Sequence, residues 1–203
     1  MTVTSTAFDQ NTLAYDNWFE KHAVIYQSEL LAVQQVIPPN KTGIEIEVGT
    51  GRFSQPLNIK FGVEPSENMA RLAEQRGIEV YHSVAESLPI ENKTFDFALM
   101  VTTVCFLSDI PKAFAEFHRI LKANGEFILA IIEKNSELGK KYLIEIFKSK
   151  FYKEAQFYST EEVSQLLRQS NFHSFSYWQT LTSANTNAIE QPQNGFGKGG
   201  GLL

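Results

Sequence analysis

The chain has 203 residues, a formal net charge of -5 and a single cysteine, Cys105. Its length suits one domain with an ordinary core, and one cysteine excludes an internal disulfide framework. A net negative charge without a dense Lys/Arg block disfavours nucleic acid as the main partner. No apolar run approaches the ~20 residues that a membrane helix needs, and residues 1–12 lack the apolar core of a secretion signal. We expect a cytoplasmic protein without a membrane span.

The N-terminal part of the chain is predicted to be helical after a loose tail. Residues 1–12 are polar and resemble an unanchored terminus. Apolar residues recur at helical spacing over residues 14–37, and Pro38 and Pro39 then end the pattern. The sequence therefore predicts one long helix in front of the first strand.

From residue 43 onward, short apolar runs alternate with helical patterns. The run from Phe95 to Thr102 is nearly continuous, as expected of a parallel strand buried on both faces. Ser159 and Glu162 fit a capping box at the start of a helix. Such alternation predicts a doubly wound α/β sheet with right-handed crossovers. The predicted strands are 43–48, 59–64, 78–82, 95–102, 127–132 and 172–181; helices are expected between 66 and 77 and over 111–122, 137–149 and 159–169; 182–198 is a loop, and the remaining apolar residues are too few for a strand.

Two acids, Glu47 and Glu64, and a Gly-x-Gly turn lie at the ends of the first two predicted strands. The first strand leads into Gly49 and Gly51, and the second ends at Glu64, 13 residues after Gly51. Glycines at such a turn let the backbone approach a ligand closely. An acid at the tip of the next strand can accept hydrogen bonds from ribose hydroxyls. The spacing therefore favours a site for an adenosine-containing cofactor.

Four segments in order carry the motifs of a known family: residues 43–53, 62–66, 85–89 with 95–97, and 119–125. Over residues 40–132 they resemble the class I S-adenosylmethionine (SAM)-dependent methyltransferases, in particular the ubiquinone/menaquinone-biosynthesis (methyltransferase type 11) group. The resemblance implies a Rossmann-like sheet of seven strands with helices on both faces. It places the last strand antiparallel between strands five and six.

The resemblance also implies how the chain is organised. It predicts one domain over residues 1–203, with an N-terminal helical lid over 1–39 and a SAM-binding core over 40–132. Residues 133–203 would supply acceptor-side helices and a C-terminal hairpin that is cut short relative to the family. With SAM as cofactor and S-adenosylhomocysteine (SAH) as product, the expected cofactor contacts are Glu45, Glu47, Gly49, Thr50, Gly51, Glu64, Pro65, Met69, Ala85, Glu86 and Val101. The expected substrate-pocket residues are Tyr15, Trp18, Thr103 and Cys105.

Glu47 departs from the family pattern of acid, apolar residue and three alternating glycines. If the motif starts at Glu45, Glu47 replaces the first glycine; if it starts at Glu47, Phe53 replaces the last. We favour the first register because Gly43 then gives the strand its usual lead-in. Strand alternation would put Glu45 and Glu47 on the same side, ~7 Å apart. Their repulsion would be relieved by the cationic centres of SAM or by Arg52.

These features predict a methyltransferase that acts on a small-molecule acceptor by in-line displacement. The alternatives are a non-catalytic SAM-fold binding module and, less favoured, a nicotinamide-dependent oxidoreductase, for which the glycine set is incomplete. The four histidines lack metal-ligand spacing, so no metal site is expected. A phenol or carbon-acid acceptor would need a general base, for which Tyr15 and His22 are candidates. The acceptor and the oligomeric state stay open.

Overall fold

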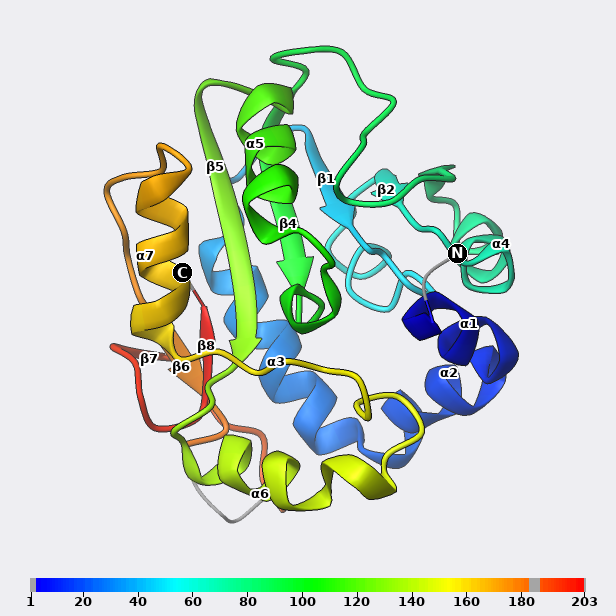
Figure 1. Cartoon of the computed structure of the whole chain (residues 1–203), viewed down its shortest axis with the longest axis vertical. Coiled ribbons are helices and arrows are strands. Elements are labelled where there is room, and N and C mark those ends of the chain that lie inside the picture. Colours follow the sequence, from blue (N-terminus) through cyan, green and yellow to red (C-terminus); the bar gives the residue numbers. More distant parts are fainter. Residues whose placement is uncertain (1–2, 183–186, 203) are drawn as a thin grey trace.

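A computed structural model describes residues 3–182 and 187–202 of the chain. These residues form an eight-stranded sheet in the order β3-β2-β1-β4-β5-β8-β6-β7 (Figure 1). The first five strands are mutually parallel, whereas β8 is antiparallel to both of its neighbours and β7 is antiparallel to β6. The strands are β1 Gly43–Ile46, β2 Phe61–Val63, β3 Glu79–Tyr81, β4 Phe95–Val101, β5 Leu121–Ile132, β6 Trp178–Thr180, β7 Gln193–Asn194 and β8 Gly200–Leu202.

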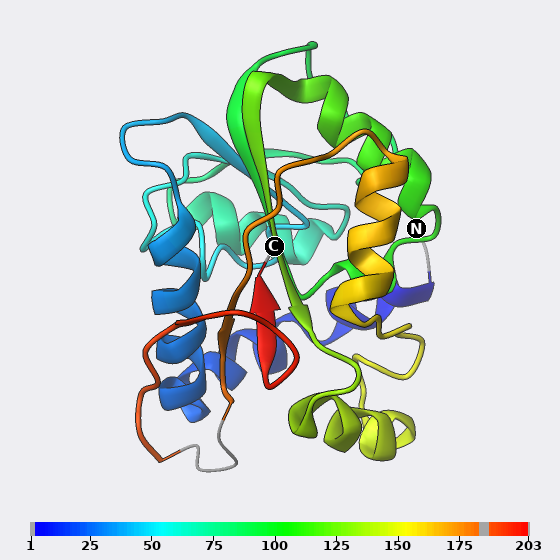
Figure 2. The same ribbon diagram turned by 90° about the vertical axis from the view of Figure 1, so that its left-hand side faces the viewer.

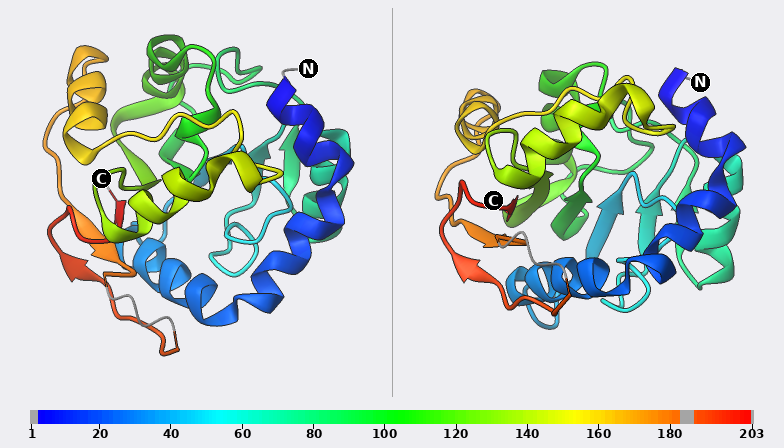
Figure 3. Two further views of the ribbon diagram at one scale, coloured as in Figure 1. Left: turned by 60° about the horizontal axis from the view of Figure 1, so that its bottom comes forward. Right: turned by 90° about the horizontal axis from the view of Figure 1, so that it is seen from below.

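Helices cover both faces of the sheet and the end of the sheet at which the parallel strands have their carboxyl termini. In Figure 2, α3 lies on one side of the sheet, and α5 and α7 lie on the other. Figure 3 shows α1, α2 and α6 around the carboxyl ends of the parallel strands. Within the described ranges, every helix is too short or too polar for a transmembrane segment. The α-helices are α1 Val3–Gln10, α2 Thr12–Lys21, α3 Ala23–Val36, α4 Glu67–Gln75, α5 Ile110–Ile120, α6 Glu137–Glu145 and α7 Thr160–Gln169, and the 3₁₀ helices are η1 Val104–Phe106 and η2 Ile146–Lys148.

The central strand β4 explains why its apolar run is nearly continuous. Successive residues of a strand point to opposite faces, so a strand covered on both sides needs apolar residues at every position. Ala98 and Met100 belong to the core that includes α5 and α7. Phe97 and Leu99 belong to the core that includes α3. The sheet is therefore a buried layer between two helical layers.

The expected fold is confirmed. The sheet is doubly wound with helices on both faces, and its last strand, β8, lies antiparallel between β5 and β6. The two-residue strand β7 adds an eighth strand at the edge, beside β6. The predicted capping box is also present, because the side chain of Ser159 accepts from the backbone of Glu162 and the Glu162 side chain accepts from the backbone of Ser159.

Three predictions near the ends of the chain are wrong. Residues 1–12 are not a tail, since most of them form α1, which packs on α4. Residues 14–37 are not one helix, because α2 ends and α3 begins at His22. Residues 200–202 form β8 although they are few, because strands on both sides bond to their backbone. In each case contacts between distant segments override a local pattern.

Candidate functional site

The loop after β1 has the backbone of a glycine turn. Glu47, Gly49 and Gly51 all have positive φ, at 57°, 56° and 81°. At Gly51 an added Cβ would lie 2.4 Å from the side chain of Ile78, so the packing of the loop also requires glycine. Glu47 thus occupies a left-handed position that glycine adopts at lower cost. This supports the register in which Glu47 replaces the first glycine of the motif.

Glu64, at the end of β2, ties this loop to the next helix. Its carboxylate accepts from the backbone N–H of Gly49 at 2.8 Å and from that of Ser66 at 2.9 Å. Ser66 in turn caps α4 by accepting from the N–H of Met69. Burial raises the pKa of Glu64, and the two backbone hydrogen bonds oppose that rise. The acid is therefore held at the mouth of the glycine loop.

A cavity of about 70 Å³ lies at this edge, between the loop and the N-terminal helices. Glu47, Glu64 and Glu86 line it, and no lysine, arginine or histidine of the described chain does. Burial, together with Glu64 and Glu86, raises the pKa of Glu47, while a hydrogen bond from the backbone of Ala85 opposes the rise. Buried carboxylates without a cation are costly, so a cationic ligand would be stabilised here.

Glu45 and Glu47 do not share surroundings, contrary to the prediction from strand alternation. The Glu45 carboxylate accepts from the hydroxyl of Ser54 and lies outside the cavity that Glu47 lines. The reason is that β1 ends at Ile46 and the positive φ of Glu47 redirects the chain. Burial raises the pKa of Glu45 to about 8. The expected role of Arg52 between the two acids is also wrong.

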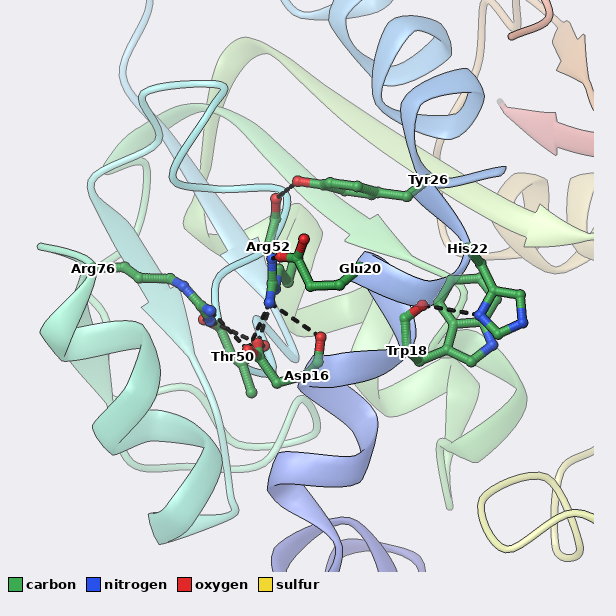
Figure 4. Close-up of polar contacts among 8 residues, drawn as sticks. All are labelled: Asp16, Trp18, Glu20, His22, Tyr26, Thr50, Arg52 and Arg76. Carbon is green, nitrogen blue, oxygen red and sulfur yellow. Dashed lines mark hydrogen bonds and ion pairs between the residues drawn. The ribbon is translucent and has the colours of Figure 1, made fainter. Parts of the chain in front are cut away.

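Arg52 instead belongs to an ion cluster that joins α2 to the glycine loop (Figure 4). Asp16 accepts from Nε and Nη2 of Arg52 at 2.9 and 2.6 Å, and from Nη1 and Nη2 of Arg76 at 2.8 and 2.9 Å. The hydroxyl of Thr50 donates to the same carboxylate at 2.7 Å, and Glu20 pairs with Arg52 from outside. Burial acts to raise the pKa of Asp16, but these hydrogen bonds outweigh it and hold the pKa below its ordinary value.

Sequence reasoning missed this cluster and one wall of the cavity. Asp16, Arg52 and Arg76 lie far apart in the chain, and no spacing pattern relates them. Phe8 lines the cavity from α1, in the segment for which the sequence predicts a tail. Its ring contacts those of Tyr15 and Phe106, with centroids 5.6 and 5.2 Å apart. The only signal in the sequence is that Phe8 stands out as an aromatic residue in a polar stretch.

The structure brings about half of the predicted site residues together at the cavity. Of the substrate-pocket candidates, Trp18 instead stacks on His22 and lies outside it (Figure 4). Cys105 lines a separate cavity of about 10 Å³, and burial raises the pKa of its thiol to about 12. The predicted residues that line the cofactor-side cavity are Tyr15, Glu47, Gly49, Glu64, Pro65, Met69, Glu86 and Thr103. Those that do not are Trp18, Glu45, Thr50, Gly51, Ala85, Val101 and Cys105.

A much larger hollow lies elsewhere. It measures about 810 Å³ and is lined by residues before β4, by the start of β5 and by residues 171–176. This hollow lies at the amino ends of the strands, away from the glycine loop. Ligands of doubly wound sheets bind at the carboxyl ends. We therefore assign the functional site to the smaller, acid-lined cavity.

Comparison with known proteins identifies the family of this chain. Residues 44–129 match the family described as methyltransferase domain. The crystal structure of a SAM-dependent methyltransferase of Thermotoga maritima, described as a possible histamine N-methyltransferase, is 45% identical, covers 97% of this chain and 96% of that one, and has a TM-score of 0.93. An uncharacterized protein of Methanocaldococcus jannaschii is 41% identical over 95% of this chain and 94% of its own length. Demethylmenaquinone methyltransferase of Staphylococcus epidermidis is 25% identical over 87% and 80%. The chain belongs to the class I SAM-dependent methyltransferases and is an enzyme.

Proposed function

We propose that this enzyme transfers the methyl group of SAM to a small-molecule acceptor at the cavity lined by Glu47, Glu64 and Glu86. The observation that carries the proposal is the position of Glu64. It lies at the tip of β2, borders the cavity and accepts from the N–H of Gly49. A ribose hydroxyl is the group that such an acid would bind in an adenosine cofactor.

The charges of the cavity favour SAM over a dinucleotide. SAM carries a sulfonium and an ammonium group, which would offset the carboxylates that line the cavity. A dinucleotide would bring pyrophosphate charges toward Glu47 and Glu64, and like charges in such a site repel. In this proposal Gly49 and Gly51 lie beneath the amino-acid part of SAM, and the Ala85–Glu86 loop lies beside the adenine.

The cavity has to widen before SAM can enter. Its volume of about 70 Å³ is well below the ~300–1,000 Å³ of ordinary ligand sites. Phe8 from α1 and Tyr15 from α2 form the wall opposite Glu64. We infer that α1 moves to admit SAM and then closes over it. Closure would exclude water from the reacting groups.

The chain contributes mainly by holding the reactants. SAM supplies an activated methyl group, and well-oriented reactants can gain ~7–11 kcal/mol from proximity alone. The Asp16 cluster joins α2 to the loop that would bind SAM. It would therefore hold α2 in a fixed position relative to the cofactor. Neither predicted base is well placed. His22 is exposed and stacked on Trp18, and burial with nearby acids raises the pKa of Tyr15.

Calorimetry with SAH and with NAD tests the proposal on the wild-type protein. We expect SAH to bind and NAD to show no heat of binding. A methyl-transfer assay with SAM labelled at the methyl group should then report transfer to a small molecule. Because the Thermotoga relative is described as a possible histamine N-methyltransferase, small amines are the first acceptors to assay. Binding of NAD but not SAH would reject the proposal.

A further inference from the structure

A further acid, which is half-buried, lies at the same end of the sheet, outside the cavity described above. Glu29, on α3, lines a cavity of about 20 Å³ at the carboxyl ends of β4 and β5. Burial alone raises the pKa of Glu29 to about 8, because no hydrogen bond or cation among the described residues offsets it. Thr180 lines the same cavity, is only 2% exposed, and its Oγ1 has no hydrogen-bond partner within the described chain. The Glu29 carboxylate and the Thr180 hydroxyl therefore line one small cavity, and neither has a hydrogen-bond partner among the described residues.

This space adjoins the cofactor-side cavity. Thr102 lines the cavity of Glu29, and the next residue, Thr103, lines the cofactor-side cavity. Tyr15 lines the cofactor-side cavity, and burial raises its pKa together with the charges of Glu45, Glu64 and Glu29. A molecule bound at Glu29 would thus lie next to whatever binds at Glu64.

Two tyrosine rings connect α6 to the wall of the cofactor-side cavity. Tyr142 on α6 and Tyr152 after η2 have ring centroids 5.2 Å apart, and Tyr152 is 5.5 Å from Phe106, which lines the cofactor-side cavity. Burial raises the pKa of Tyr142 to about 12, with a further contribution from Glu29. Ring faces attract cations, and more strongly where water is excluded. No lysine, arginine or histidine lines the Glu29 cavity in the described parts of the chain.

We propose that Glu29 is the acceptor-binding carboxylate, and that the acceptor is a small amine whose ammonium group binds between Glu29 and the hydroxyl of Thr180. The proposal rests on the proposed function, because it assumes that SAM binds beside Glu64. A water-sized group needs about 10–15 Å³, so the cavity of about 20 Å³ fits an ammonium group. For methyl transfer the amine nitrogen at Glu29 would face the methyl group of SAM, and the rest of the acceptor would extend away from it.

The chemistry of the step balances without another reactant. The ammonium group transfers one proton to the Glu29 carboxylate, which leaves a neutral amine and a carboxylic acid. The nitrogen lone pair then forms the N–C bond as the S–C bond of SAM breaks, and the electron pair of that bond stays on sulfur. The products are a methylated ammonium group and SAH. A carboxyl in a dry, apolar site takes up a proton more readily than one in water, which favours the first step.

Calorimetry on the SAH complex tests the proposal. The probes are 2-phenylethylamine and histamine, with 2-phenylethanol and 4-ethylphenol as neutral counterparts. We expect at least one amine to bind and neither neutral compound to bind as tightly. Glu29→Gln should weaken amine binding by about tenfold or more, the loss expected for a charged hydrogen bond. It should leave the affinity for SAH unchanged. Glu137→Gln, the same change at an exposed acid of α6, should change neither affinity.

Each contrary result has a definite meaning. Equal affinity of the Glu29→Gln variant for the amine, or equal affinity of the wild type for an amine and its neutral counterpart, overturns the proposal. If SAH binds and neither amine does, the acceptor assignment fails while the proposed function stands. If SAH itself does not bind, the proposed function fails first. If Glu29→Gln does not fold, Thr180→Val replaces it, with weaker amine binding expected.

Discussion

Two groups of wholly or partly buried acids in this enzyme have opposite surroundings. Asp16 is surrounded by two arginines and a hydroxyl, and its pKa lies below the ordinary value. Glu29, Glu47 and Glu64 have no lysine or arginine against them in the described chain, and burial raises the pKa of each. The first arrangement stabilises the fold by itself, whereas the second is costly until a cation arrives. The contrast separates an acid that stabilises the fold from the acids that we propose bind a cationic ligand.

The largest expected effect of this contrast is on the pH dependence of stability. Acids with a raised pKa favour the folded state below their unfolded pKa of about 4.5, and that stability is lost as pH rises toward about 8, the folded pKa of Glu29 and Glu45. A pKa that differs by one between the folded and unfolded protein corresponds to about 1.4 kcal/mol. We therefore expect the free energy of unfolding in urea to fall by on the order of several kcal/mol between about pH 5 and pH 8.

The Glu29→Gln variant, unfolded in urea at the same pH values, isolates the contribution of one of these acids. It should match the wild type near pH 5 and be more stable near pH 8, since it removes one of the costly charges. Asp16 acts in the other direction. Because folding lowers its pKa, its contribution to the free energy of unfolding is present above about pH 3.8 and is lost as the pH falls below that value. A free energy of unfolding that rises from pH 5 to 8 would contradict the contrast.

Removing Asp16 should have the next largest effect. In Asp16→Ala the guanidinium groups of Arg52 and Arg76, whose side chains are 16% and 20% exposed, lose their shared partner. Breaking a buried pair from one side costs about 3–5 kcal/mol, and we expect the lower end here. Urea unfolding measures the loss. The control is Glu20→Ala, at the exposed end of the same cluster, where a surface pair is worth about 0–1 kcal/mol. Equal losses in the two variants would mean that the cluster does not anchor α2.

Removing Glu64 should act on the ligand more than on the fold. We expect Glu64→Ala to weaken SAH binding by about 1.5–3 kcal/mol, the contribution of a hydrogen bond to a charged group. Calorimetry measures it, with Glu91→Ala as control at an exposed acid in the loop before β4. Unchanged affinity in Glu64→Ala would show that SAH does not bind at the tip of β2.

The smallest expected effect concerns Glu47. A left-handed backbone costs a non-glycine residue about 1 kcal/mol, with or without a ligand, so Glu47→Gly should raise the free energy of unfolding by about that amount. The same variant removes one of the carboxylates that the cationic groups of SAM would offset, so it should bind SAM more weakly, by up to about tenfold. Tighter binding by the glycine variant, measured by calorimetry, would mean that repulsion of Glu47 with Glu64 and Glu86 outweighs its attraction for SAM.

Much of the core was predictable because its signals are local. The buried strand β4 follows from an unbroken apolar run, α7 from the capping box of Ser159 and Glu162, and the loop after β1 from Gly49 and Gly51. The ends of the chain were less predictable. Helix α1 depends on Asp9, which accepts from the hydroxyl of Ser66 and the N–H of Asn68 on α4. No pattern within residues 3–10 indicates that contact.

The sequence by itself determined the class of fold, the family and the edge of the sheet that carries the site, because periodicity, caps and glycine turns act over a few neighbouring residues. Only the tertiary structure decided which acids are paired and which are not. Asp16 and Glu29 are both acids on N-terminal helices, and nothing in their local sequence distinguishes them. One meets arginines from the glycine loop and the end of α4, and the other meets the apolar ends of β4 and β5. Burial and distant partners set the charge of each, and both arise only when segments far apart in the chain come together.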